Sequence, residues 1–181
     1  MKAVLISIRP QWCEKIASGK KTVEVRKSRP RLTPPFRCYI YCSMPKTKDP
    51  RQILEIHGVD GKIRKANGKV IGEFICDRLF PISVFDNGSI QNWNYENMEE
   101  SCLTYEELAN YIGNDKTGYG WRISNLYIYD TPQYLSRFKK PCKNEADCCV
   151  CPHFDYSIMD CVGRMITYPP QSWCYVEEVS L

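Results

Sequence analysis

The sequence lacks any apolar stretch near the ~20 residues that a membrane-spanning helix needs. Near the N-terminus, the apolar residues 3–8 are stopped by Arg9 and Pro10, too early for the core of a secretion signal. Internal repeats and long low-complexity segments are absent as well. With 12% aromatic and 25% charged residues, the composition also excludes a disordered chain. These features predict a soluble protein of the cytoplasm.

A complete framework of disulfides is not expected either. The chain has 11 cysteines, an odd number, without a recognisable secretion signal. In a reducing compartment most of them are expected to be small buried hydrophobes, as Cys38, Cys42 and Cys76 would be in strand-like segments. The length of 181 residues suffices for one domain with a real core. We expect a single domain over residues 1–181 with a cysteine-rich insertion at about 142–161.

Charge is distributed unevenly along the chain, although the net charge is only +4. Residues 1–69 carry 17 Lys and Arg against 5 Asp and Glu, a net charge of +12. Residues 70–181 carry 8 against 16, a net charge of −8. Segregation of this size suggests that one face meets an anion such as nucleic acid. The alternative is that the two halves neutralise each other in the folded protein.

Short strands separated by turn residues dominate the pattern. The predicted strands cover residues 2–8, 22–26, 37–43, 70–77, 126–129 and 173–179, with a weaker one at 53–57, and a first helix covers about 10–18. Pro10 suits the first turn of that helix and Gly19 its end. Thr104 and Glu107 form a capping box for a second helix, which Gly113 ends. The fold class is therefore α+β, mainly β: a compact barrel with short flanking helices.

The stretch 19–26, Gly-Lys-Lys-Thr-Val-Glu-Val-Arg, combines a helix end with a strand of period two. The alternation puts Val23 and Val25 toward the core and sends Glu24 and Arg26 out together on the other face. Lysines donate to phosphate, and an arginine fork suits bidentate contacts. A carboxylate among these cations stays ionised and either orients Arg26 or accepts hydrogen bonds from a base edge. The alternative is a solvated strand face with cross-strand ion pairs.

Two tryptophans are candidates for contact with a base. Trp121 follows Gly118 and Gly120 and precedes Arg122, a setting in which a ring is able to stack on a base. The alternative for Trp121 is a core position that closes the barrel. Trp173 begins the last predicted strand after two prolines and is expected to flank the cleft.

Cysteines gather between residues 142 and 161. Cys148 and Cys151 have the two-residue spacing of a zinc knuckle, and Cys142 and Cys161 are expected to complete a tetrahedral site. Cys149 or His153 would replace either of the outer two. A closed site of four thiolates stabilises a fold that lacks a core of its own, so we predict a structural zinc. Disulfides and unligated thiols are the alternatives.

The motif of residues 19–26 resembles the signature of the ASCH domain family, G-x-K-x-x-E-x-R. Gly19, Lys21, Glu24 and Arg26 match this signature position by position. The preceding Ser-Ile-Arg-Pro at 7–10 and the segments 120–130 and 169–177 look like those of phage and Gram-positive members. The resemblance implies a PUA-like β-barrel whose cleft is lined by the motif and binds RNA or a nucleotide.

On this basis we predict a basic cleft for RNA, a nucleotide or a modified nucleoside. The predicted ligand contacts are Arg9, Lys20, Lys21, Glu24, Arg26, Trp121, Arg122 and Trp173. One branch of the family is similar to an amidohydrolase of N4-acetylcytidine that uses Thr, Lys and Glu, and another resembles a metal-dependent ribonuclease. Lys21 and Glu73 match the first branch, but Glu24 stands where its threonine belongs.

Three functions follow from the sequence. The first is binding of RNA or a nucleotide. The second is hydrolysis, with Lys21, Glu73 and Glu24 as the catalytic candidates. The third is a protein-interaction domain whose basic half docks on an acidic partner.

Overall fold

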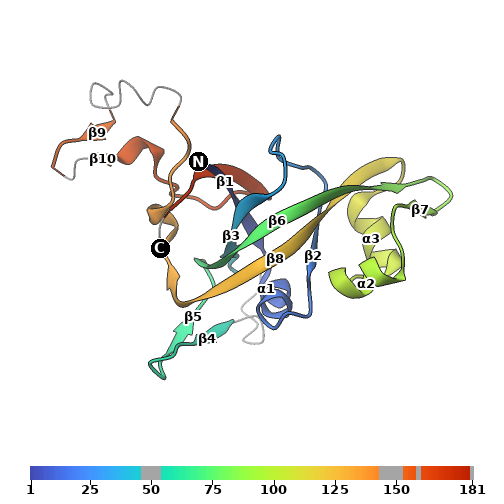
Figure 1. Ribbon diagram of the computed structural model, residues 1–181, viewed down its shortest axis with the longest axis horizontal. Helices are drawn as coiled ribbons and strands as arrows, with labels where there is room; N and C mark the ends of the chain where they lie inside the picture. Colours follow the sequence, from blue (N-terminus) through green and yellow to red (C-terminus); the bar gives the residue numbers. More distant parts are fainter. Residues whose placement is uncertain (46–53, 143–152, 158–159, 180–181) are drawn as a thin grey trace.

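A mixed sheet of seven strands organises the chain in the computed structural model, which describes residues 1–45, 54–142, 153–157 and 160–179 (Figure 1). The main path of the sheet runs β11-β1-β3-β6-β8-β2, and β7 pairs with β6. The strands of this sheet are β1 (Lys2–Ile8), β2 (Val23–Arg26), β3 (Phe36–Cys42), β6 (Lys69–Val84), β7 (Ile90–Gln91), β8 (Lys116–Gln133) and β11 (Trp173–Glu177). All neighbours are antiparallel except β1 and β3, which are parallel.

The sheet is open, so the predicted closed barrel is wrong. Within the described part of the chain, the edge strands β2 and β11 do not pair with each other. Instead, side chains of β11 hold the loop that follows β2: the indole N–H of Trp173 donates to Ser28 Oγ (3.1 Å), and the Arg31 N–H donates to the Tyr175 hydroxyl (2.7 Å). That loop carries three prolines, which lack the N–H that a β-ladder requires.

The predicted elements near the N-terminus and the capping box are confirmed. Helix α1 (Pro10–Ala17) has Pro10 in its first turn, and Gly19 follows its end with a φ of 72°. Helix α3 (Tyr105–Ile112) has both hydrogen bonds of the capping box between Thr104 and Glu107, and Gly113 ends it. Strands β6 and β8 are longer than the predicted 70–77 and 126–129, because they form one continuous antiparallel ribbon through several register shifts. The last strand, β11, ends two residues earlier than the predicted 173–179.

The short helix α2 (Tyr95–Ser101) was not predicted. It begins with a capping box between Asn94 and Asn97, a pair of residue types outside the usual Ser/Thr–Glu pattern. Helices α2 and α3 pack together beside β2 at one end of the β6–β8 ribbon (Figure 1). The end of α2 is bound to the start of β2, since the N–H of Thr22 donates to the carbonyl of Glu100 at 2.8 Å.

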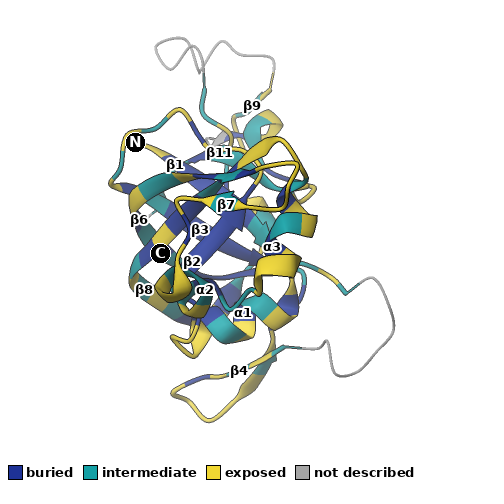
Figure 2. Ribbon diagram, turned by 90° about the vertical axis from the view of Figure 1, so that its right-hand side faces the viewer, coloured by how far each residue is buried: buried dark blue, intermediate teal, exposed yellow. Residues whose placement is uncertain are grey.

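Buried residues lie on both faces of the sheet (Figure 2). One cluster packs α1, through Cys13 and Ile16, against β1, β3, β6 and β8. A second, around Tyr39 and Phe138, covers the opposite face beneath the C-terminal segment. The third joins β2 to α3 and includes Val23, as the alternation of the strand predicts. No helix in the described ranges is long and apolar enough to cross a membrane.

Two small hairpins project from the sheet (Figure 1). The first pairs β4 (Glu55–His57) with β5 (Ile63–Lys65), and the second pairs β9 (Phe154–Asp155) with β10 (Asp160–Cys161). Short 3-10 turns at Leu135–Arg137 and Val162–Arg164 complete the C-terminal segment.

Candidate functional site

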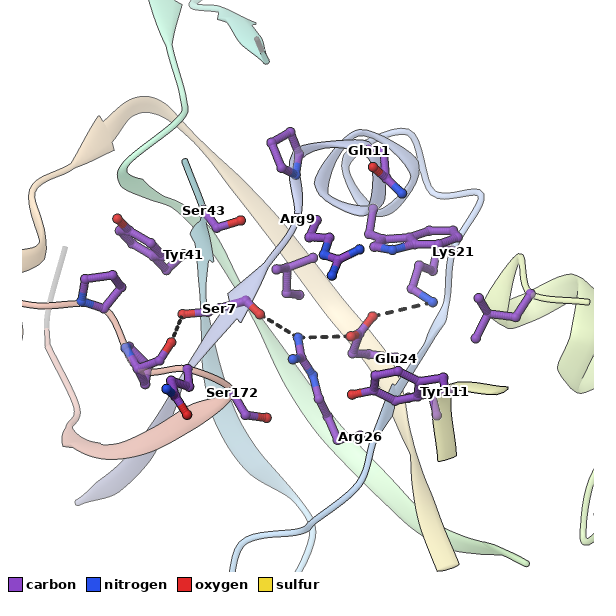
Figure 3. Close-up of a pocket in the computed structure, with 18 of the residues that line it drawn as sticks. Ser7, Arg9, Gln11, Lys21, Glu24, Arg26, Tyr41, Ser43, Tyr111 and Ser172 are labelled. Atoms are coloured by element: carbon purple, nitrogen blue, oxygen red, sulfur yellow. Dashed lines mark hydrogen bonds and ion pairs between the residues drawn. The ribbon is translucent and has the colours of Figure 1, made fainter. Parts of the chain in front are cut away.

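A pocket of about 1150 Å³ opens where the sheet fails to close (Figure 3). Its walls come from the junction of β1 and α1, from β2 at one edge, from α3, and from the residues just before β11 at the other edge. The polar and aromatic side chains lining it are Ser7, Arg9, Gln11, Trp12, Lys21, Glu24, Arg26, Tyr41, Ser43, Glu107, Asn110, Tyr111, Gln171 and Ser172.

Three charged residues of the motif form one connected chain on the wall of this pocket. Glu24 Oε2 lies 3.4 Å from Lys21 Nζ, and Glu24 Oε1 lies 3.0 Å from Arg26 Nη2. Lys21, Glu24 and Arg26 are only 2%, 6% and 8% exposed. The alternative of a solvated strand face is therefore wrong. We call these three residues the charged ladder.

Both ends of the charged ladder are fixed by backbone carbonyls. Lys21 Nζ donates to the carbonyl of Ser101 at the end of α2 (2.6 Å) and lies 5.0 Å from the ring centre of Trp12. Arg26 Nη2 donates to the carbonyl of Ser7 at 2.7 Å. Burial lowers the pKa of Lys21 below its ordinary value of 10.5, and the neighbouring Glu24 opposes this shift.

One donor atom of Arg26 is left unpaired. Its Nε is buried and has no hydrogen-bond partner among the described residues. Tyr111 of α3 lines the same pocket, and burial raises the pKa of its phenol, while the charge of Arg26 opposes the rise. A buried donor without a partner is costly to the folded state.

The structure brings part of the predicted site together. Arg9, Lys21, Glu24 and Arg26 all line the pocket, and Glu24 and Arg26 share one face of β2 as predicted. Lys20 is exposed and does not line the pocket, because it precedes the strand and points to solvent beyond the end of α1.

Trp121 does not contact the pocket. It is fully buried and packs edge-on against Phe36, with ring centres 6.0 Å apart. The prediction that Trp121 stacks on a base is therefore wrong, and the alternative, a core position, is correct. Because β8 alternates, its neighbour Arg122 points the other way, to the surface near Asp77 (3.9 Å). Trp173 is partly buried between Trp121 and Tyr175 and holds the loop after β2 rather than lining the pocket.

Glu73 lies outside the pocket. It sits on β6, where its carboxylate is ion-paired with Arg37 and accepts a hydrogen bond from the Tyr129 hydroxyl (2.7 Å). Burial, followed by the bond to Glu73, raises the pKa of Tyr129, so this phenol stays a donor. Lys21 lines the pocket and Glu73 does not, so the two residues do not face one substrate there, as the hydrolase alternative requires.

The predicted zinc ligands are only partly described. Cys148, Cys149 and Cys151 lie outside the described residues. Cys142 and Cys161 are described, and both lie close to the guanidinium of Arg164. Arg164 is itself ion-paired with Glu177. No group of three or more His, Cys, Asp or Glu able to hold a metal occurs in the ranges that are described.

Helix α3 supplies pocket residues that the sequence analysis missed. Glu107, Asn110 and Tyr111 all line the pocket, at the i, i+3 and i+4 spacing of one helix face. The signal was available, because the capping box fixes where the helix starts and hence which residues share a face. What the sequence does not give is the direction in which this polar face points.

Three solved structures from Zymomonas mobilis resemble the chain over nearly its whole length, whereas no family model and no curated protein matches the sequence. The ASCH protein itself is 18% identical, with a TM-score of 0.51 over 97% of this chain and 88% of that chain. Two single-substitution variants of it give 19% identity and a TM-score of 0.51 (98% and 92% covered), and 18% identity and 0.52 (97% and 89% covered). The chain therefore has the fold of the ASCH domains.

Proposed function

We propose that the pocket binds one nucleotide unit, either free or within RNA. The observation that carries this proposal is the charged ladder on the pocket wall. Placing three ionised groups in a protein interior costs several kcal/mol per ion before pairing, which well-packed apolar residues would avoid. Ligand binding would explain why this cost is tolerated, because the hydrogen-bonding groups that the charged ladder leaves unused would then bind the ligand.

The pocket has the chemistry of a nucleotide site. Arg9 and Arg26 both line the pocket, and the exposed guanidinium of Arg9 at the rim offers donors to a phosphate oxygen or a base carbonyl. The carboxylate of Glu24 has lone pairs left for the N–H groups of a base edge. Trp12 and Tyr111 add aromatic surface on which a base is able to stack.

Calorimetric titration with the four nucleoside monophosphates, their nucleosides and a six-nucleotide RNA tests this proposal. We expect a nucleotide to bind more tightly than its nucleoside, and Arg9→Ala to weaken nucleotide binding about tenfold, as for a charged hydrogen bond. Arg122→Ala is the matched control, since Arg122 is exposed and does not line the pocket. If no nucleoside, nucleotide or RNA binds, or if both variants bind alike, the proposal fails.

Hydrolysis is the alternative, and the same samples test it through analysis of their products. Glu73 is bound by Arg37 and Tyr129 outside the pocket. This argues against an amidohydrolase mechanism in which Lys21 and Glu73 act on the same substrate. Turnover of N4-acetylcytidine or RNA that is lost in Lys21→Met would replace the binding proposal by an enzymatic one.

A further inference from the structure

Three exposed cations follow directly after the charged ladder. Lys27, Arg29 and Arg31 lie in the loop after β2, and the sequence has no acidic residue between Glu24 and Asp49. Across the described ranges, no carboxylate forms an ion pair with any of these three cations. We call residues 27–31 the basic strip.

Aromatic rings support two of these cations. Lys27 Nζ lies 5.4 Å from the ring centre of Tyr111, and Arg29 Cζ lies 5.7 Å from that of Tyr119. Attraction between a cation and the face of a ring holds the long side chain along the surface. Since Tyr111 also lines the pocket, the basic strip begins at the rim of the pocket.

Two side chains of β11 hold the basic strip in place, one through the Ser28 hydroxyl and one through the backbone N–H of Arg31. Trp173 donates to Ser28 Oγ (3.1 Å), and the Arg31 N–H donates to Tyr175 (2.7 Å). Trp173 itself follows Ser172, which lines the pocket. The strip is therefore fixed relative to the pocket at both ends, and a surface ordered in advance pays less conformational entropy when it binds.

We infer that the basic strip carries the backbone of a single-stranded RNA, one nucleotide of which occupies the pocket. This inference rests on the proposed function of the pocket. Cations next to aromatic rings form the kind of surface that tracks the phosphates of a single strand. A duplex would have to open before one of its bases reached a pocket lined by Glu24 and Arg26, whereas a single strand offers its bases freely.

Fluorescence anisotropy with a labelled six-nucleotide RNA, with mononucleotide calorimetry beside it, tests the inference. The strip variant Lys27→Ala/Arg29→Ala/Arg31→Ala should bind the hexamer at least tenfold more weakly and the mononucleotide as tightly as the wild type does. With about 0.7 counterions released per phosphate of a single strand, the slope of log K against log salt should fall by roughly 2. The control Lys62→Ala/Lys65→Ala/Lys116→Ala removes the same charge at three other exposed lysines and should bind the hexamer normally.

A second variant separates geometry from charge. Trp173→Phe keeps the ring but removes the hydrogen bond to Ser28, and should weaken hexamer binding several-fold with an unchanged salt slope. The inference is overturned if the hexamer binds no tighter than the mononucleotide, if the strip and control variants behave alike, or if a duplex or a decaglutamate peptide competes better than the single strand. If the wild type binds no mononucleotide, the proposed function of the pocket is refuted instead.

Discussion

The ammonium nitrogen of Lys21 lies 3.4 Å from Oε2 of Glu24, and both side chains are almost wholly withdrawn from solvent. This pair links α2 to β2, because the same ammonium donates to the carbonyl of Ser101 at the end of α2, while Glu24 on β2 is also ion-paired with Arg26. The charged ladder thus couples the pocket to the packing of the helices. Its residues are expected to influence both ligand binding and stability.

Glu24→Gln should lower the free energy of unfolding by about 3–5 kcal/mol, because it leaves two buried cations without their shared counter-charge. Urea denaturation at pH 7 measures this change. Adding Lys21→Met to Glu24→Gln should restore part of the loss, since one of the two unpaired cations is then gone. Asp60→Asn removes an exposed ion pair with Arg64 and is the control, which should lower the midpoint far less than Glu24→Gln does. A Glu24→Gln midpoint equal to that of the wild type would contradict the argument.

The lowered pKa of Lys21 should make stability, and the nucleotide binding proposed for the pocket, depend on pH. The folded pKa lies below the ordinary 10.5 because of burial, so between these two values the unfolded state binds more protons. The free energy of unfolding should therefore rise with pH between the folded pKa of Lys21 and 10.5, and this rise should be absent in Lys21→Met. Mononucleotide affinity should fall over the same window as the charge is lost. If the free energy of unfolding depends on pH in the same way for the wild type and Lys21→Met, the rise does not come from Lys21.

Glu73→Gln should reduce stability by about 1–3 kcal/mol and leave nucleotide affinity unchanged. Its carboxylate binds Arg37 and Tyr129 away from the pocket, so the loss is that of charge-assisted hydrogen bonds in a partly buried cluster. Thermal denaturation together with calorimetric titration separates the two effects. A loss of nucleotide binding at unchanged stability would place Glu73 in the site after all.

We propose that the cysteine-rich segment binds a structural zinc, and elemental analysis of protein purified without chelator should give about one zinc per chain. Removal of the metal should lower the melting temperature, and so should Cys142→Ser or Cys161→Ser. Cys38→Ser is a control for zinc content, because Cys38 is buried in the sheet among core residues. Metal-free protein with disulfides between these cysteines, detected by mass spectrometry, would contradict the proposal.

Local signals in the sequence determined most of the elements. Period-two alternation defined β2, with Val23 packed in the core and Glu24 and Arg26 on one shared face. Pro10 and Gly19 bounded α1, and the capping box of Thr104 bounded α3. These features depend on residues within a few positions of one another, so their chemistry is visible along the chain.

Only the tertiary structure decided whether the sheet closes and which side chains share the pocket. The loop after β2 docks on Trp173 and Tyr175 through contacts between residues about 145 positions apart, so the sheet remains open and the pocket lies between its edges. Trp121 was ambiguous for the same reason: the preceding Gly120 allows exposure, whereas packing against Phe36 buries the ring completely. Burial depends on contacts between distant segments. The sequence pattern alone allowed the charges of Lys21, Glu24 and Arg26 to be exposed to solvent, and only the tertiary structure buries them as the charged ladder.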